Sequence, residues 1–156
     1  MCHFNYCPLV WHFCGVTNTK KLEQLQKRAL KFIFNDKDYS YPELLQKANI
    51  PTLEIGRLRL IATEIYKAIH KETPQYISDI FTLKKDNYNL RHKNNITVPL
   101  VRTTRYGLNS LRYQGSKIWN SLPDNIKISP NQETFKKLIK SWEGTKCHCN
   151  FCNSLK

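Results

Sequence analysis

Apolar residues recur at helical spacing along this chain, and that periodicity constrains the fold more than any other feature. The strongest run begins after Thr52, with apolar side chains at Leu53, Ile55, Leu58, Ile61, Ala62, Ile65 and Ile69. Because positions three and four apart lie on one face of a helix, this run predicts an amphipathic helix that extends to about Lys71.

A second helical pattern runs from Lys20 to Phe34, with Thr19 as its cap. Its apolar positions, which we expect to face the core, are Leu22, Leu25, Ala29, Leu30, Ile33 and Phe34. Its other face carries Lys20, Lys21, Gln24, Lys27, Arg28 and Lys31. The sequence therefore predicts a helix with a cationic outer stripe, which is either a binding surface or simply a solvated face.

Shorter elements complete a mainly α fold. Ser40 and Glu43 have capping-box spacing, which predicts a helix to Ala48, and further helices are expected over 75–81, 114–122 and 133–142. The β-branched residues from 98 to 106 predict a strand, and Gly107 allows it to turn back through 110–113. The fold class is thus a small helical bundle with a short β-hairpin or extended segment around 98–113.

A basic stretch with aromatic residues runs from Arg102 to Pro123. Its cations are Arg102, Arg105, Arg112 and Lys117, and it contains no Asp or Glu. The whole chain has 25 Lys and Arg against 12 Asp and Glu, a net charge of +13. Such an excess favours an anionic partner, and a phosphate backbone fits it best. A solvated cationic surface is the alternative. A membrane surface is a weaker one, because no helix combines a basic polar face with a broad face of Trp, Phe and Leu throughout its length.

Catalytic motifs are missing from the sequence. The aspartates stand at 36, 38, 79, 86 and 124 without a paired motif on a strand, whereas polymerases and nucleases hold Mg²⁺ with closely placed carboxylates. There is no phosphate-binding glycine loop and no nucleophile elbow. We therefore expect this chain to be non-catalytic by itself.

Six cysteines lie at the two ends of the chain, at positions 2, 7, 14, 147, 149 and 152. No secretory signal precedes them and no run approaches ~18 apolar residues, so we expect an intracellular, reducing environment. Cys147, Cys149 and Cys152 are candidate zinc ligands, with a fourth from Cys7, His12, Cys14 or a second chain. A tail of unliganded thiols is the alternative.

An ordered set of motifs runs along the chain, at Cys7–Cys14, Lys27–Asp36, Tyr41–Leu45, Tyr88–Arg91, Arg102–Gly107, Ile118–Pro123 and Trp142–Cys152. In these motifs the chain resembles the region after the palm in reverse transcriptases of jockey-like non-LTR (LINE-type) retrotransposons. The resemblance implies a helical thumb-like region over 1–81, a basic extended segment with C-terminal helices packed on it over 82–143, and a Cys-rich tail over 144–156. The palm of such an enzyme, with its Mg²⁺ carboxylates, would lie upstream, and the apolar residues 3–14 would pack against it or on later helices.

From charge and resemblance together we expect binding of RNA or an RNA/DNA hybrid through backbone phosphates, in the nucleus or cytoplasm. The candidate contacts are Lys20, Lys27, Arg28, Lys31, Arg102, Arg105, Tyr106, Arg112 and Lys117. Tyr106 and Tyr113 either stack on bases or pack in the core, and Trp119 and Trp142 are assigned to the core. A stand-alone, zinc-binding protein-interaction module is the alternative function.

Overall fold

A computed structural model describes residues 6–13, 16–35, 38–84, 94–103 and 106–144 of the chain. Within these ranges the fold is mainly α-helical, as predicted. The helices, in chain order, are α1 (Pro8–Trp11), α2 (Val16–Phe34), α3 (Tyr41–Ala48), α4 (Leu53–Ile69), α5 (Gln75–Ser78), α6 (Leu111–Asn120), α7 (Asp124–Lys127) and α8 (Gln132–Ile139).

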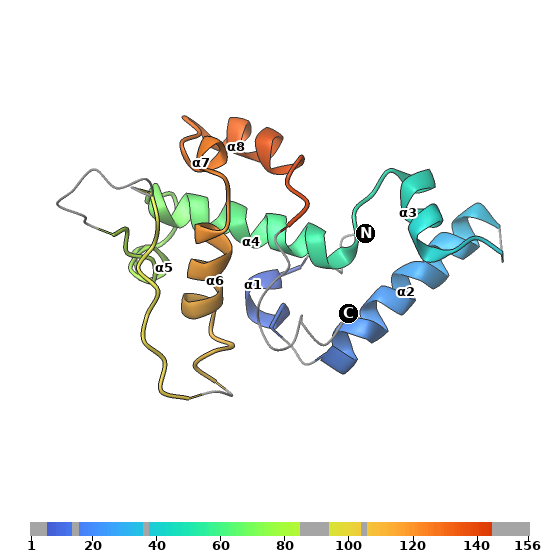
Figure 1. Cartoon of the computed structure of the whole chain (residues 1–156), viewed down its shortest axis with the longest axis horizontal. Coiled ribbons are helices and arrows are strands. Elements are labelled where there is room, and N and C mark those ends of the chain that lie inside the picture. Colours follow the sequence, from blue (N-terminus) through green and yellow to red (C-terminus); the bar gives the residue numbers. More distant parts are fainter. Residues whose placement is uncertain (1–5, 14–15, 36–37, 85–93, 104–105, 145–156) are drawn as a thin grey trace.

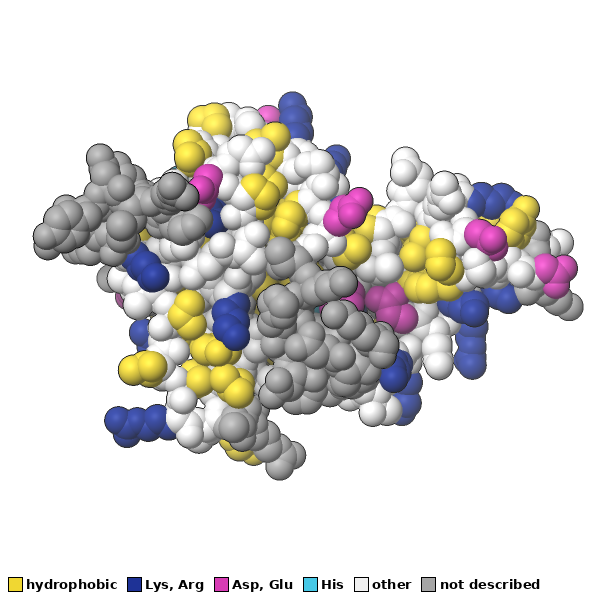
Figure 2. Space-filling model, viewed as in Figure 1, with side chains coloured by type: hydrophobic (Ala, Val, Ile, Leu, Met, Phe, Trp, Pro, Cys, Tyr) yellow, Lys and Arg dark blue, Asp and Glu magenta, His cyan; other side chains and the backbone are white. Residues whose placement is uncertain are grey.

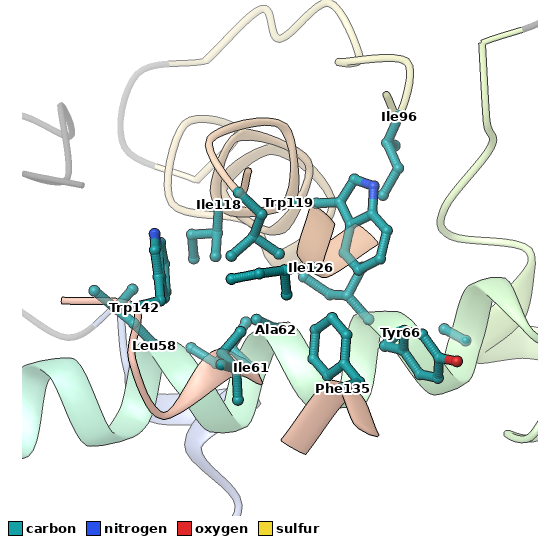
Figure 3. Packing of buried hydrophobic residues seen from close by; sticks show 14 of the residues in the cluster. Leu58, Ile61, Ala62, Tyr66, Ile96, Ile118, Trp119, Ile126, Phe135 and Trp142 are labelled. Carbon is teal, nitrogen blue, oxygen red and sulfur yellow. The ribbon is translucent and has the colours of Figure 1, made fainter. Parts of the chain in front are cut away.

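Helix α4 is the central element of the bundle (Figure 1). Thr52 caps its start by accepting a hydrogen bond from the backbone N–H of Ile55, and α1, α2, α5, α6 and α8 all contact it. Ile61, Ala62 and Ile65 of α4 are fully buried. Figure 3 shows how residues of α4 face Ile118 and Trp119 of α6 and Phe135 of α8 in one apolar cluster. Burial of this face, rather than helix propensity, stabilises so long a helix.

Among residues 6–13, the described part of the apolar N-terminal segment, Leu9, Trp11 and Phe13 pack on α4 or the main core, one of the two positions expected for this segment. Leu9 and Phe13 lie against the main core, and the guanidinium of Arg57 lies 5.0 Å from the centre of the Trp11 ring. Pro8 occupies the first turn of α1, where its missing N–H costs no helical hydrogen bond. Tyr6 and Val10 remain exposed.

Helices α2 and α3 form a second, smaller core beside α4. Leu30 of α2 packs with Leu44 and Leu45 of α3. A buried polar network accompanies this core: the hydroxyl of Tyr41 is within hydrogen-bonding distance of Glu23 and Gln26. Burial, with the neighbouring Glu23 carboxylate, raises the pKa of Tyr41 strongly, so the phenol keeps its proton and can donate.

The predicted inward face of α2 is wrong in part, since Leu30 is buried and Leu22 and Phe34 are half-buried. Leu25, Ala29, Phe32 and Ile33 are exposed, and the buried positions are Gln26 and Leu30. Among the described helices, α2 has its main contacts with α3 and α4, so its buried strip is narrow. The hydroxyl of Tyr41 lies 2.6 Å from the side-chain oxygen of Gln26 within this strip. The helix therefore presents an exposed apolar face, defined by Leu25, Ala29, Phe32 and Ile33, beside its cationic face.

The segment before α6 is extended, but the return strand of the predicted hairpin is absent among the described residues. Ser110 instead accepts a hydrogen bond from the N–H of Tyr113 and caps α6, so 111–113 form the first helical turn. Gly107 lies against Val101 and Thr103, where a Cβ would come within 2.8 Å of a backbone oxygen. Residues 124–132, expected to be loop, include the short helix α7, which Pro123 precedes.

The Trp119–Pro123 motif has a structural role: it fixes the segment that precedes the basic stretch. Asn120 pairs with the backbone of Ile96 on both sides, accepting from its N–H at 2.8 Å and donating to its carbonyl at 2.9 Å. The indole N–H of Trp119 donates to the carbonyl of Asn94, and the buried Lys127 donates to the Asn95 side chain. Ile96 forms an antiparallel bridge with Leu83 on one edge, and the side chain of Asn120 takes the place of a second neighbouring strand on the other. The side chain of Ile96 is fully buried.

Candidate nucleic-acid interface

Helix α2 places its predicted cations on one exposed stripe. Lys20 and Arg28 are exposed, and Lys27 and Lys31 are half-buried at the edge of the packed face. Among the described residues, Lys20, Lys27 and Arg28 have no ion-pair or hydrogen-bond partner, whereas Lys31 does have an interaction. Three positive charges on one helix face are therefore not neutralised by the described part of the fold.

The cations of the central stretch lie around the start of α6. Arg102, Arg112 and Lys117 are exposed, and Arg105 lies outside the described residues. The ammonium of Lys117 lies 4.7 Å from the centre of the Tyr113 ring, which holds that side chain along the helix. Arg102 and Arg112 have no partner within the ranges the structure describes.

These two sets of cations do not form one continuous patch. Figure 1 shows α2 extending beyond the N-terminal end of α4, while α6 packs along the middle and far part of α4. In Figure 2 dark-blue side chains lie over α2 at the right and around α6 at the lower left, as two separate groups. A phosphate chain would have to cross the face between them to touch both.

The two tyrosines differ in their environments. Tyr106 is 76% exposed, so its ring is open to a stacking partner, although it also has an interaction within the protein. Tyr113 is half-buried and lies beneath the ammonium of Lys117. Its exposure is therefore intermediate between that of a stacking residue and that of a core residue. Trp119 and Trp142 are buried in the core, as predicted.

The metal-ligand prediction concerns residues outside the described ranges, since Cys147, Cys149 and Cys152 all lie beyond residue 144, and Cys14 is also undescribed. Of the candidate fourth ligands that are described, Cys7 is exposed and His12 is buried. Within the described residues, no group of three or more His, Cys, Asp or Glu side chains is placed to hold a metal ion.

Comparison with known proteins gives no relative. No family model, curated protein or solved structure matches this chain. The described helices also include none that is both long enough and apolar enough to cross a membrane.

Sequence reasoning missed the exposed apolar face of α2. A usable indication was present, because apolar residues at 22, 25, 29, 30, 32, 33 and 34 cover more of the helix circumference than one neighbouring helix can bury. It also missed the hydrogen-bonding role of Asn120, since a side chain that pairs with a distant backbone leaves no periodic trace in the sequence.

Proposed function

We propose that this chain binds RNA or an RNA/DNA hybrid through backbone phosphates, as a non-catalytic C-terminal region of a non-LTR retrotransposon reverse transcriptase. The observation that carries the proposal is the stripe on α2, where Lys20, Lys27 and Arg28 are left without partners among the described residues. Unpaired cations on a rigid helix attract phosphates without an internal ion pair having to break. The net charge of +13 acts in the same direction.

The proposal includes an upstream palm as a partner in a longer protein, with Mg²⁺ bound there and not in this chain. Its support is the ordered set of motifs together with the exposed apolar face of α2, on which Phe32 is 88% and Ile33 65% exposed. Apolar side chains this exposed on one helix face are typical of protein contacts. The proposed location is the nucleus or cytoplasm, where such nucleic acids occur.

The test compares the loss of hybrid affinity when three positive charges are removed from α2 with the loss when three are removed from other helices and segments. Lys20→Gln, Lys27→Gln and Arg28→Gln are combined in one variant; the matched control combines Lys84→Gln, Lys136→Gln and Lys137→Gln, which are all exposed. Affinity for a 20-base-pair RNA/DNA hybrid is measured by fluorescence anisotropy at constant salt. The α2 variant is expected to lose at least tenfold more affinity than the control. Equal losses of affinity in the two variants would contradict a specific role for α2 and would attribute binding to the net charge of the chain.

A second candidate is a stand-alone protein-interaction module with zinc at Cys147, Cys149 and Cys152. The observation that favours it is the same apolar face of α2, because a protein partner would bury Leu25, Phe32 and Ile33 while phosphates would not. The two candidates differ in hybrid binding. The first predicts a salt-dependent affinity for the hybrid that Phe32→Ser with Ile33→Ser leaves unchanged, and the second predicts no such affinity.

A further inference from the structure

A cleft is lined by residues at the C-terminal end of α3 and in the turn that follows it, by Arg59 of α4 and by Lys140, which follows α8. Its volume is about 620 Å³, within the range of ~300–1,000 Å³ that is typical of small-molecule sites. We call it the α3–α8 cleft. Its lining residues are Leu45, Gln46, Asn49, Ile50, Pro51, Arg59 and Lys140.

The turn after α3 opens this cleft. Asn49 ends α3 in the left-handed conformation, with φ 51°, and Pro51 follows two residues later. The N–H groups of Asn49 and Ile50 satisfy the last carbonyls of α3, donating to Gln46 and Leu45. Neither carboxamide, of Gln46 or of Asn49, bonds to another described side chain, so both can turn toward a ligand.

The remaining lining residues divide into an apolar wall and a pair of cations. Leu45, Ile50 and Pro51 form the wall, which suits the face of a flat ring. Arg59 is oriented by the bond from its Nε–H to the carbonyl of Trp142 at 2.9 Å, which leaves its terminal NH₂ groups for an anion. Lys140 supplies a second positive charge, and no lining residue is acidic.

One nearby carboxylate must be counted. Burial lowers the pKa of Arg59, while the charge of Glu143 opposes that shift, so Glu143 partly offsets the field of Arg59. The lining residues carry two cations and no acidic group, so their charge exceeds that of the exposed Glu143 carboxylate. The positive charge and the apolar wall would therefore both raise the affinity for an anionic ligand that also has an apolar face.

We propose that the α3–α8 cleft binds one unpaired nucleotide, with its base on the apolar wall and its phosphate between Arg59 and Lys140. The carboxamides of Gln46 and Asn49 each offer a donor and an acceptor, which matches the edge of a base. A simple carboxylate ion would use the two cations and would leave the apolar wall and the carboxamide acceptors without a role. The nucleotide is either free or part of a single strand, and only the second case rests on the proposed nucleic-acid function.

Nuclear magnetic resonance of the full, ¹⁵N-labelled chain tests this directly. The reporters are the side-chain amides of Gln46 and Asn49 and the Nε–H of Arg59, titrated separately with 5′-AMP, 5′-CMP, inorganic phosphate, an eight-nucleotide single strand and a tetraglutamate peptide. Asn49→Gly with Lys140→Gln removes two contacts while glycine keeps the left-handed backbone. Lys137→Gln on the same helix is the charge-matched control.

The expected result is saturable shifts of all three reporters with the mononucleotides, and a Kd at least fivefold higher in the Asn49→Gly, Lys140→Gln variant than in Lys137→Gln. Stronger binding of the single strand than of the mononucleotide would assign the cleft to a strand, and equal binding would assign it to free nucleotide. The proposal is overturned if phosphate alone binds as tightly, if tetraglutamate shifts the reporters and the nucleotides do not, or if no reporter moves.

The two proposals fail separately. The variant with Lys20→Gln, Lys27→Gln and Arg28→Gln leaves the cleft intact, so its mononucleotide titration should match the wild type whatever happens to hybrid binding. A hybrid affinity unaffected by that variant, with cleft reporters that still titrate, would refute the α2 interface and keep the nucleotide cleft.

Discussion

Replacing Asn120 by alanine is the sharpest test of how the fold holds the segment before the basic stretch. The substitution deletes both bonds to Ile96, at 2.8 and 2.9 Å, while the Ile96 side chain stays fully buried. Each lost hydrogen bond costs about 0.5–1.5 kcal/mol, and a buried group left without a partner costs about 1–3 kcal/mol. Because the released backbone can partly reach water, we expect a total loss of roughly 2–4 kcal/mol.

Two measurements follow from that estimate. Urea denaturation should report the loss as a lower free energy of unfolding for Asn120→Ala. The control is Asn125→Ala, at an exposed position of α7, which should change the free energy of unfolding by no more than about 0.5 kcal/mol. Amide exchange at Ile96 should accelerate by roughly 30- to 1,000-fold, the same energy expressed as an equilibrium constant. An unchanged exchange rate at Ile96, with a cost below about 0.5 kcal/mol, would refute the proposed clamp.

Three further predictions concern single groups. Hydrogen bonds from Ser40 hold the pKa of Glu43 below its ordinary value of 4.5, so the stability that the carboxylate adds to α3 is present above pH 4.5 and is lost as the pH falls through the lowered pKa. The difference in unfolding free energy between wild type and Glu43→Gln should therefore shrink from pH 7 to pH 3. A difference that stays constant over this range would contradict the prediction. Lys127→Met should lower the stability measured by thermal unfolding by about 1–3 kcal/mol, since the Asn95 side chain and the carbonyl of Asn120 lose their donor. A gain in stability would show that the desolvation of the buried ammonium outweighs the hydrogen bonds that it makes. Elemental analysis should find one zinc per chain and none in Cys149→Ser, and a metal-free wild type would dispose of the zinc site.

The sequence was sufficient to predict the helices where one face is both apolar and buried. Leu58, Ile61 and Ile65 show this for α4, because a central helix buries the face that its periodicity marks. Helix α2 shows the limit: Leu25 and Ile33 fit the same pattern, yet only the strip at Gln26 and Leu30 meets another helix. Periodicity identifies apolar residues, and the arrangement of neighbouring helices decides which of them are buried.

Propensity and periodicity gave the wrong secondary structure where a segment is compatible with both strand and helix and one side-chain hydrogen bond decides between them. Residues 110–113 were compatible with a strand, but Ser110 caps α6 and commits them to helix. The candidate interface was predictable in its charge and not in its continuity, because Arg102 and Arg112 stand far along the chain from Lys20 and Arg28 and only the packing on α4 sets their separation. The α3–α8 cleft could not be predicted from the sequence, since Arg59 and Lys140 are far apart along the chain and only the fold brings them to the same cleft.

The salt dependence of hybrid binding tests the central proposal most directly. If the chain binds phosphates, log K for an RNA/DNA hybrid should fall linearly with log salt between 50 and 200 mM, with a slope of about −0.7 to −0.9 for each phosphate neutralised. Three contacts from α2 give a slope near −2 to −3, and additional contacts from Arg102 and Arg112 make it steeper. A hybrid affinity that is weak at low salt and insensitive to salt would contradict the proposed function.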